Sequence, residues 1–205
     1  MNCTLYFVRH GETEHNVLGL IQGHSDSALT EEGKKQALEL QNKFKKIRLS
    51  AFYSSDLNRA KETAKIIALP HKLKVIYSQA LRERNYGSIE GKPRELLDKI
   101  YKSFDKLTHK ERFHHRADPQ AESNKDVIER LLPFLKQVAK KSSGKSVLLV
   151  THGGLIGIFL RYIGFVTPYT RTHIKNGAIV KIETDGKEFK VKETFRIFDN
   201  NGWLT

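Results

Sequence analysis

The stretch SVLLVTHGGLIGIFLRYIG, residues 146–164, places a histidine and two glycines between two apolar runs. The first run, residues 146–152, is short and predicts a buried strand. The second, residues 153–164, is long enough for a buried helix. A strand that passes directly into a helix is the repeating unit of α/β proteins with a parallel sheet.

The same alternation extends over the rest of the chain. Strands are predicted at 3–8, 50–55 and 73–78, helices at 30–48, 56–69 and 123–141, and a closing hairpin at 178–184 and 189–198. Thr30 and Ser123 are suitable N-caps, Asp126 stands in capping-box position, and Pro70 ends the second helix. We therefore expect an α/β three-layer sandwich, with a mainly parallel central sheet and helices on both faces.

The bulk composition indicates one globular domain over residues 1–205, of which 39% are hydrophobic. No apolar run approaches the roughly 20 residues of a membrane span, and CTLYFV follows Met1 directly, without the regions of a signal peptide. We expect a soluble, cytoplasmic protein without a membrane partner. The single cysteine, Cys3, cannot form an internal disulfide, and its place in a predicted strand favours a packing role.

The net charge of +13 points to an anionic partner, which could be nucleic acid, an acidic membrane surface or a small polyanionic substrate. The lysines are scattered over many segments and do not form one stripe interleaved with aromatic residues. Nucleic acid is therefore disfavoured, although folding could still gather a basic patch. No sequence feature indicates an oligomeric state.

Cationic side chains follow three of the predicted strands. Arg9 and His10 follow the first, Arg59 lies in the first turn of the helix after the second, and His152 follows the strand at 146–151. Ligands of α/β sheets gather at the carboxyl ends of the strands, so these side chains should meet at one edge. Two arginines, two histidines and free helical amides favour an oxyanion, and phosphate fits best.

Glycines next to these residues allow a close approach of the backbone to a ligand, namely Gly11 and the pair Gly153 and Gly154. The remaining histidines have no such company and are interpreted as solvated or structural: His15, His24, His71, His109, His114, His115 and His173. None shows the spacing of a zinc site, so we expect no metal centre.

Five blocks in order resemble the histidine phosphatase superfamily, the phosphoglycerate-mutase-like proteins. VRHGETEHN, residues 8–16, resembles its Arg-His-Gly signature, and the other blocks are IQGHSDSALTEEGKKQA (21–37), YSSDLNRAKETA (53–64), LRERNYGSIEG (81–91) and VLLVTHGGLI (147–156). DPQAES, residues 118–123, departs from the pattern with Ala121 where many members carry glycine.

The resemblance implies a chemistry without metal or cofactor. His10 would be the nucleophile, with its second ring nitrogen donating to a backbone carbonyl, and Glu83 would be the acid and base at the leaving oxygen. Arg9, Arg59 and a protonated His152 would surround the phosphoryl oxygens. Residues assigned to substrate or phosphate binding are Gly11, Asn16, Gln22, Gly23, Tyr86, Arg94 and Gly153.

Arg82 and Arg84 flank Glu83 and could instead hold it in ion pairs. If Glu83 lies on a strand, its immediate neighbours point to the other face, and we expect both arginines to point elsewhere.

Three functions stay open. The favoured one is a metal-independent phosphomonoester hydrolase that acts through a phosphohistidine on a small phosphorylated substrate, because GSIEG, residues 87–91, is similar to the phosphatase branch and the longer mutase insertions are missing. The alternatives are a phosphoglycerate mutase and a non-catalytic anion or nucleic-acid binder. For the substrate, the resemblance suggests sugar or glycolytic phosphates, fructose 2,6-bisphosphate or ribazole phosphate.

The segment 92–116 carries eight Lys or Arg residues against four Asp or Glu, and lies in a helical, lid-like insertion expected at about 92–122, over the site. It could be a solvated amphipathic helix with Leu96, Ile100 and Phe104 inward. Alternatively, its cations could read a second anionic group of the substrate. Lys92 and Arg94 would then lie nearest, with Arg112 and Arg116 further out.

Overall fold

A mixed sheet forms the centre of the computed structural model, which describes residues 1–167, 169–170, 172–199 and 202–204. In this part of the chain seven strands are ordered β3-β2-β4-β1-β5-β6-β7. Their bounds are β1 Cys3–Arg9, β2 Leu49–Ser54, β3 Val75–Tyr77, β4 Ser146–Thr151, β5 His173–Thr184, β6 Phe189–Asp199 and β7 Gly202–Trp203. The first four in this order are parallel, and β5 to β7 extend the sheet antiparallel. The expected α/β class is confirmed.

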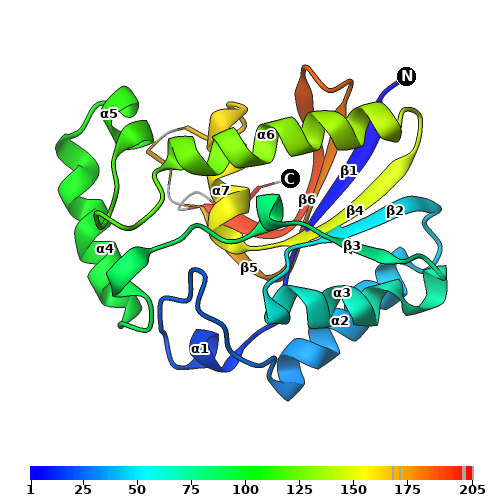
Figure 1. Ribbon diagram of the computed structural model, residues 1–205, viewed down its shortest axis with the longest axis horizontal. Coiled ribbons are helices and arrows are strands. Elements are labelled where there is room, and N and C mark those ends of the chain that lie inside the picture. The colour runs from blue at the N-terminus through cyan, green and yellow to red at the C-terminus, as the bar shows by residue number, and fades with distance from the viewer. Residues whose placement is uncertain (168, 171, 200–201, 205) are drawn as a thin grey trace.

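Helices cover both faces of this sheet and make the expected three layers (Figure 1). Their bounds are α1 Glu14–Val17, α2 Glu31–Phe44, α3 Asn58–Ala68, α4 Arg94–Ser103, α5 His109–His114, α6 Asn124–Lys141 and α7 Gly153–Tyr162. Strand β4 shows why two layers form: Val147 and Leu149 pack under α6 and α7, whereas Leu148 and Val150 pack under α2 and α3. Alternate strand residues point to opposite faces, so each face has its own core.

The predicted helix starts have the expected caps. The Thr30 hydroxyl accepts a hydrogen bond from the Gly33 amide at 2.9 Å, and Ser123 forms a capping box with Asp126. Helix α3 ends at Ala68, just before Pro70, which lies in a short 3₁₀ helix at Leu69–His71. These local signals determine where α2, α3 and α6 begin or end.

Two boundaries differ from the sequence-based expectation by four or five residues, and the others differ by two at most. Helix α2 ends at Phe44, short of residue 48, and β5 begins at His173, five residues before the predicted strand at 178. The pairing of β5 with β6 is irregular between Ile174 and Ile179, and Gly177 has a φ of +70°. A bulge interrupts the alternation of side chains, so the first part of β5 lacks a strand-like pattern.

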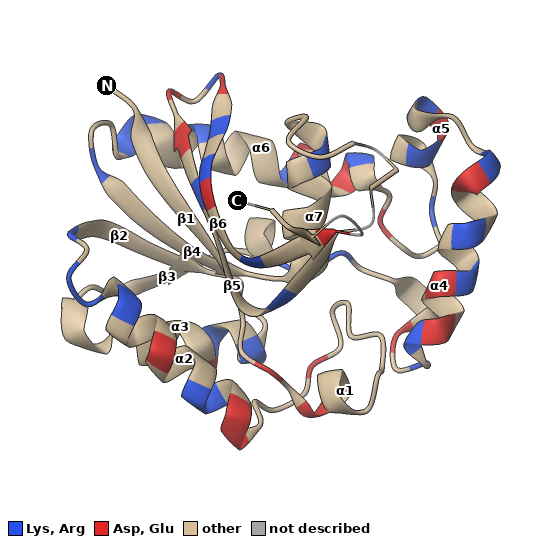
Figure 2. Ribbon diagram, turned by 180° about the vertical axis from the view of Figure 1, so that it is seen from behind, with Lys and Arg blue, Asp and Glu red and all other residues tan. Residues whose placement is uncertain are grey.

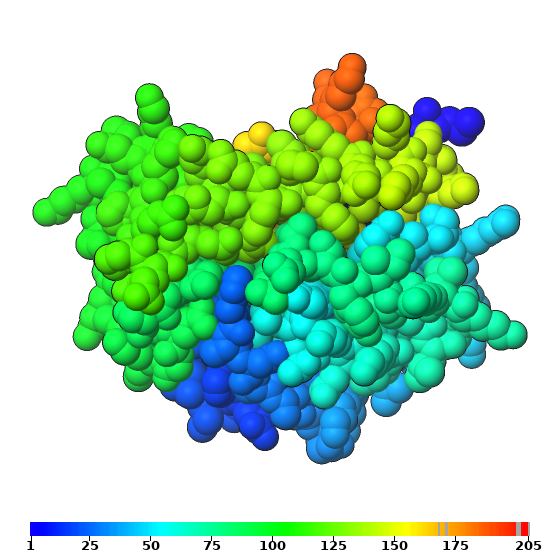
Figure 3. Space-filling view, viewed as in Figure 1, coloured from blue at the N-terminus to red at the C-terminus, as the bar shows by residue number. Residues whose placement is uncertain are grey.

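The predicted insertion forms a lid-like segment at one end of the sheet, made of α4, a 3₁₀ turn at Phe104–Lys106 and α5 (Figures 1 and 3). It is joined to the loop after α1, because the Ile21 amide donates to the Lys92 carbonyl and the Arg94 amide to the Gly19 carbonyl, at 2.9 and 2.8 Å. A small cluster of Ile21, Tyr86, Ile89 and Leu97 packs beneath it.

Helix α4 thus rests on a small apolar cluster of its own, whereas Phe113 of α5 packs against one of the two cores of the sheet. Within the described ranges, no helix has the length and apolar character that crossing a membrane requires.

Candidate active site

The three groups predicted to meet do so around a cavity of about 1170 Å³, at the carboxyl ends of β1 and β4 and beside the lid-like segment. Ten of the assigned residues line it: Arg9, His10, Asn16, Gln22, Gly23, Arg59, Glu83, Tyr86, Arg94 and Gly153. Gly11 adjoins the cavity next to His10, and the ring of His152 lies 5.0 Å from the ring of His10. The strand order therefore collects residues separated by more than 140 positions in the sequence.

His10 is held in one orientation at the end of β1. Its Nδ1 lies 2.7 Å from the carbonyl oxygen of Gly11. Burial, followed by the charges of Arg59 and Arg9, lowers its pKa well below the ordinary value, so the ring is neutral. A neutral ring that donates from Nδ1 keeps its lone pair on Nε2. The tautomer is therefore the one expected of a nucleophile at Nε2.

His152 is fully buried at the N-terminus of α7. In the described part of the chain, neither of its ring nitrogens has a hydrogen-bond partner. Burial and the charges of Arg59, His10 and Arg9 lower its pKa well below the ordinary value. His152 is therefore neutral in the free protein, since desolvation and neighbouring cations disfavour a second charge, and its protonation at a bound phosphoryl group stays a prediction. A bound phosphoryl group would act in the opposite direction.

Arg59 and Arg9 supply the positive charge. Arg59 is 1% exposed and donates to the carbonyls of Gly23 and Ser25 at 2.7 and 2.8 Å, and to Asp26 at 3.1 Å. Arg9 donates to the Ile174 carbonyl, and burial lowers its pKa to about 10. Both guanidinium groups remain charged at neutral pH and are fixed in place before any ligand binds.

The loop 22–26 is held against this site by two carboxylates. Asp26 accepts from the amides of Asn58 and Arg59 at the start of α3. Glu90 accepts from the amides of His24, Ser25 and Tyr86 at 2.9, 2.7 and 2.9 Å. Glu90 therefore joins two of the motif blocks, a positioning role that sequence reasoning did not assign.

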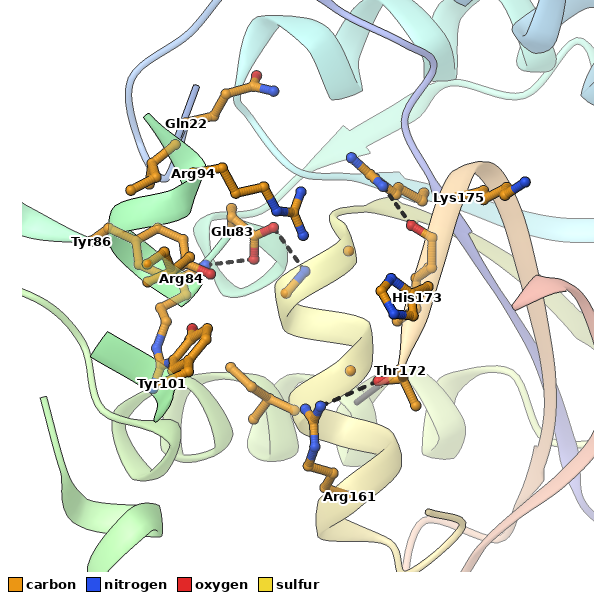
Figure 4. Close-up of a pocket in the computed structure, with 18 of the residues that line it drawn as sticks. Gln22, Glu83, Arg84, Tyr86, Arg94, Tyr101, Arg161, Thr172, His173 and Lys175 are labelled. Carbon is orange, nitrogen blue, oxygen red and sulfur yellow. Dashed lines mark hydrogen bonds between the residues drawn. The ribbon is translucent and has the colours of Figure 1, made fainter. Parts of the chain in front are cut away.

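Glu83 lies at the N-terminus of α7 (Figure 4). Its carboxylate accepts hydrogen bonds from the amides of Gly154, Leu155 and Arg84 at 2.9, 2.8 and 2.8 Å. Glycine is required at 154, because a Cβ there would lie 2.5 Å from Glu83 Oε1. The start of α7, directly after His152, thereby fixes this carboxyl group on the wall of the cavity that His10 also lines.

The two arginines next to Glu83 bind other groups, as expected, although Glu83 lies in a loop and the strand argument was wrong. Arg82 pairs with Asp56 through two hydrogen bonds of 2.7 and 2.6 Å. Arg84 is buried and binds the Glu122 carbonyl, the Tyr101 hydroxyl and the Asn124 side chain, at 3.0, 3.0 and 2.8 Å. The Glu83 carboxyl group is therefore held by amides and not by either guanidinium.

Helix α6 positions the Glu83 segment through Arg130, which the sequence analysis did not consider. Its guanidinium donates to the carbonyls of Ala80, Arg82 and Glu83 at 2.8, 3.0 and 3.0 Å. The Glu122 carboxylate completes the clamp at 2.8 Å. One side chain from a remote helix thus fixes the backbone on both sides of Arg82.

Known proteins share both the sequence pattern and the fold of this chain. Residues 5–196 match the Histidine phosphatase superfamily (branch 1). The chain belongs to this superfamily. The phosphoglycerate mutase-like protein 4 of Arabidopsis thaliana is 33% identical, over 96% of this chain and 80% of its own length.

Two solved structures show the same fold. Phosphoglycerate mutase from Bacillus anthracis has a TM-score of 0.80 and 28% identity, with 93% of this chain and 92% of that one covered. A phosphoserine phosphatase from Entamoeba histolytica, in complex with 3-phosphoglyceric acid, has a TM-score of 0.79 and 27% identity, covering 94% and 96%. The relatives of this histidine phosphatase superfamily member thus carry the names of both mutases and phosphatases.

Two glycines of this superfamily member meet where β1 passes into the site. A Cβ on Gly11 would lie 2.4 Å from the carbonyl oxygen of Gly33, and a Cβ on Gly33 would lie 2.0 Å from that of Glu12. The Gly11 amide also donates to the Thr63 hydroxyl at 3.1 Å. The first turn of α2 therefore touches the backbone next to His10 directly.

Of the four cations of the lid-like segment that were expected near the substrate, two line the cavity. Arg94 and Arg112 line the cavity, but Lys92 and Arg116 do not. Arg116 pairs with Asp126 at 2.8 Å, outside the cavity. Arg112 pairs with Asp105 at 3.1 Å and lies over the ring of Tyr169. The amphipathic interpretation also holds, since Leu97 and Phe104 are buried and Leu96 and Ile100 pack against the small cluster.

Other cavity-lining cations were missed because no motif marks them. They are Arg84, Arg161, Lys175 and Arg196, and the carboxylates that line the same cavity are Glu12, Glu83, Asp98 and Asp105. His109 and His173, interpreted as solvated or structural, also line it. No cluster of His, Cys, Asp or Glu in the described ranges has three members placed to hold a metal ion.

Proposed function

We propose that this protein is a phosphomonoester hydrolase that acts on small phosphorylated metabolites through a phosphohistidine at His10, without a metal ion. The observation that carries the proposal is the orientation of His10, whose Nδ1 is bound to the Gly11 carbonyl while its ring faces a cavity lined by Arg9 and Arg59. Phosphorylation of a histidine requires a free ring nitrogen and cations at the phosphoryl oxygens, and this geometry supports both.

The reaction has two steps. In the first, Nε2 of His10 forms a bond to phosphorus while the ester P–O bond breaks, and Glu83 gives its proton to the leaving oxygen. In the second, Glu83 takes a proton from water, whose oxygen attacks phosphorus, and the P–N bond breaks to release inorganic phosphate. Glu83 is assigned this role because its carboxyl group lines the same cavity as His10 and is fixed in position by three amides.

Charge at the phosphoryl group is balanced by side chains in this proposal. The guanidinium groups of Arg9 and Arg59 are already ordered by backbone carbonyls, so little reorganisation is needed when charge develops in the transition state. His152 takes up a proton once the bound phosphoryl group offsets the field of the arginines.

The alternative is a phosphoglycerate mutase, which the names of two relatives support. A mutase must protect its phosphohistidine from water until the phosphoryl group returns to the substrate. The cavity of about 1170 Å³ is larger than the roughly 300–1000 Å³ typical of small-molecule pockets, and this leaves room for water beside a small substrate. The size of the cavity therefore favours hydrolysis.

The proposal is tested with a panel of phosphorylated metabolites in a chelating buffer without added metal. We expect inorganic phosphate to appear with the wild type, and His10→Ala to lose at least about a thousandfold in kcat/KM. His109→Ala removes a cavity-lining histidine outside the proposed machinery and should retain activity. Rapid mixing with ³²P-labelled substrate should trap a label on the wild type that is stable to alkali and labile to acid.

Each alternative to this proposal predicts a different result. Formation of 2-phosphoglycerate from 3-phosphoglycerate, with inorganic phosphate absent, would establish the mutase. Turnover by His10→Ala close to that of the wild type would remove His10 as the nucleophile. A folded wild type that binds phosphate but neither hydrolyses nor transfers it would establish a non-catalytic binder.

A further inference from the structure

Three glycines of α7, with charged side chains next to them, extend along the cavity away from the phosphoryl site. Gly153, Gly154 and Gly157 all line the cavity. A Cβ at each would approach a different side chain: Arg9 at 3.3 Å, Glu83 at 2.5 Å and Arg161 at 3.3 Å, respectively. The start of α7 is therefore a bare backbone surface along which three functional groups are arranged.

Arg161 lies at the far end of this row and is half-buried. Its Nη2 donates to the Thr170 carbonyl at 3.1 Å and to the Thr172 hydroxyl at 3.3 Å, which fixes the plane of the guanidinium. A guanidinium has five N–H donors, and these two bonds use only those on Nη2. The donors on Nε and Nη1 have no acceptor in the described part of the chain.

The surroundings of Arg161 do not neutralise its charge. Figure 4 shows Arg161 on α7, with Tyr101 and Arg84 on other elements that face this part of the helix. Burial, opposed by Tyr101 and reinforced by the charge of Arg84, lowers the pKa of Arg161 below its ordinary value. In the described ranges Arg161 makes no ion pair, whereas Arg112 across the cavity is paired with Asp105. An ordered and unpaired cation on a cavity wall is suited to an anion.

The spacing along α7 defines how far this anion lies from the phosphoryl group. Gly157 is four residues beyond Gly153, and a helix rises about 1.5 Å per residue, so the Arg161 guanidinium lies about 6 Å further along the axis than that of Arg9. A four-bond link such as P–O–C–C–C spans roughly 4–5 Å, by the reach of three-bond backbone units of about 3.6 Å. Two anionic groups on a three-carbon skeleton match this spacing.

We propose that Arg161 is a specificity-determining residue, which binds a second anionic group, carboxylate or phosphate, on the substrate whose phosphoryl group is transferred to His10. The proposal rests on the proposed function for its chemistry, but the binding site it names is independent of turnover. It also differs from the lid hypothesis, in which the exposed Arg94 at the start of α4 reads the second anion.

The test compares 3-phosphoglycerate with glycerol 3-phosphate, which has a hydroxymethyl group in place of the carboxylate. A second pair, propane-1,3-diol bisphosphate and its monophosphate, distinguishes a phosphate from a carboxylate. We expect kcat/KM to be higher for at least one substrate with a second anionic group than for its matched monophosphate. Arg161→Gln should reduce this ratio about 10- to 100-fold, mainly through KM. Activity on the matched monophosphate should change less than threefold or so on the same scale.

Three controls make the result specific. Arg112→Gln removes the same charge from the same cavity, but from a guanidinium already paired with Asp105, and should leave the preference intact. Arg94→Gln tests the lid hypothesis directly. Arg161→Lys keeps the charge but loses the planar fork, so it should recover only part of the preference and should fold if Arg161→Gln does not.

Binding is measured separately from turnover, by calorimetry of 3-phosphoglycerate and of the bisphosphate with His10→Ala and with His10→Ala/Arg161→Gln. Weaker binding in the double variant supports the subsite even if no substrate is hydrolysed, a result that would count against the proposed function alone. Equal binding by both proteins, or a preference that follows Arg94 and not Arg161, would overturn the Arg161 subsite.

Discussion

At the scale of single residues, the carboxyl group of Glu83 is the one whose role the structure makes most testable. Glu83→Gln keeps the shape, and its one amide oxygen can still accept from the amides of Leu155 and Arg84 although its NH2 cannot accept from Gly154, but the side chain cannot transfer a proton. We expect kcat on alkyl phosphates to fall by roughly a hundredfold to ten-thousandfold. Aryl phosphates should lose far less, because their leaving oxygen needs little protonation. Steady-state kinetics on both classes provide the comparison.

Glu12→Gln is a matched control for this prediction. Glu12 lines the same cavity, and its carboxyl group accepts from the Thr30 hydroxyl at 2.8 Å, a contact that an amide oxygen can keep. The variant should behave like the wild type on both classes of ester. If Glu83→Gln loses the same factor on alkyl and aryl phosphates, Glu83 orders the site and does not transfer the proton.

Sequence reasoning indicated His10 and Arg59 because each follows a strand or opens a helix, and it indicated Glu83 only through the resemblance of residues 81–91 to a family block. It did not find Arg130 or Arg161. Both lie within helices, where a cation every few residues is ordinary, and only the packing of α6 and α7 shows that these two face the site. The protonation state of His152 also depends on burial that no local pattern reveals.

At the scale of elements, helix α6 acts on the chemistry through one side chain. Arg130→Met removes the clamp on the carbonyls of Ala80, Arg82 and Glu83, so the Glu83 carboxyl group should lose its fixed position. Displacement by about 1 Å can cost on the order of a hundredfold in rate. We therefore expect kcat on alkyl phosphates to fall about 10- to 100-fold, with a smaller loss on aryl phosphates and little change in KM.

Lys136→Met removes an equal charge from an exposed position of α6 and serves as its control. Circular dichroism checks that both variants keep the fold. Arg130→Lys should be intermediate at best, because an ammonium cannot reproduce the planar fork that reaches several carbonyls together. Full activity of Arg130→Met on alkyl phosphates would show that the Glu83 segment keeps its place without the clamp.

Element boundaries were predictable where a local signal exists. The hydroxyl of Thr30 begins α2, Ser123 begins α6, and the turn at residues 185–187 joins β5 to β6. The first part of β5 was missed, because the irregular pairing around Gly177 is a property of two strands together. Two separate helices in the lid-like segment likewise replace the single amphipathic helix considered from the sequence.

At the scale of the whole molecule, the two buried histidines connect the site with stability. The pKa values of His10 and His152 are lowered in the folded protein, whereas an unfolded histidine has a pKa of about 6.5. Below that pH the unfolded chain takes up protons that the folded protein does not. The free energy of unfolding should then fall by up to about 1.4 kcal/mol per pH unit for each histidine.

Urea unfolding at pH 7.5, 6.5 and 5.5 measures this effect, with His10→Gln as the comparison. The wild type should lose stability towards pH 5.5, and the variant should lose about half as much in the part due to these two residues. Inorganic phosphate should reduce the loss, because it favours the protonated ring of His152. Equal pH dependence in the wild type and in His10→Gln would contradict the lowered pKa of His10.

The net charge of +13 is not concentrated on one face of the helices α2, α4 and α5. Figure 2 shows Lys and Arg on α2, α4 and α5 interspersed with Asp and Glu. In the described ranges, Arg9 and Arg161 line the cavity without an ion pair, and because both are buried or partly buried, their charge is screened less than that of this mixed surface. The cavity therefore has the more direct bearing on anionic ligands.

The contact of Gly11 with Gly33 has a consequence for motion. Backbone meets backbone there, without a side chain between them that could change its rotamer, so β1 and the first turn of α2 form a stiff floor beneath His10. The lid-like segment is held instead by a small apolar cluster, by two backbone hydrogen bonds to the loop after α1 and by the packing of Phe113 against the core. We therefore expect any opening for entry and release to occur in the lid-like segment, with product release sensitive to the packing of Leu97.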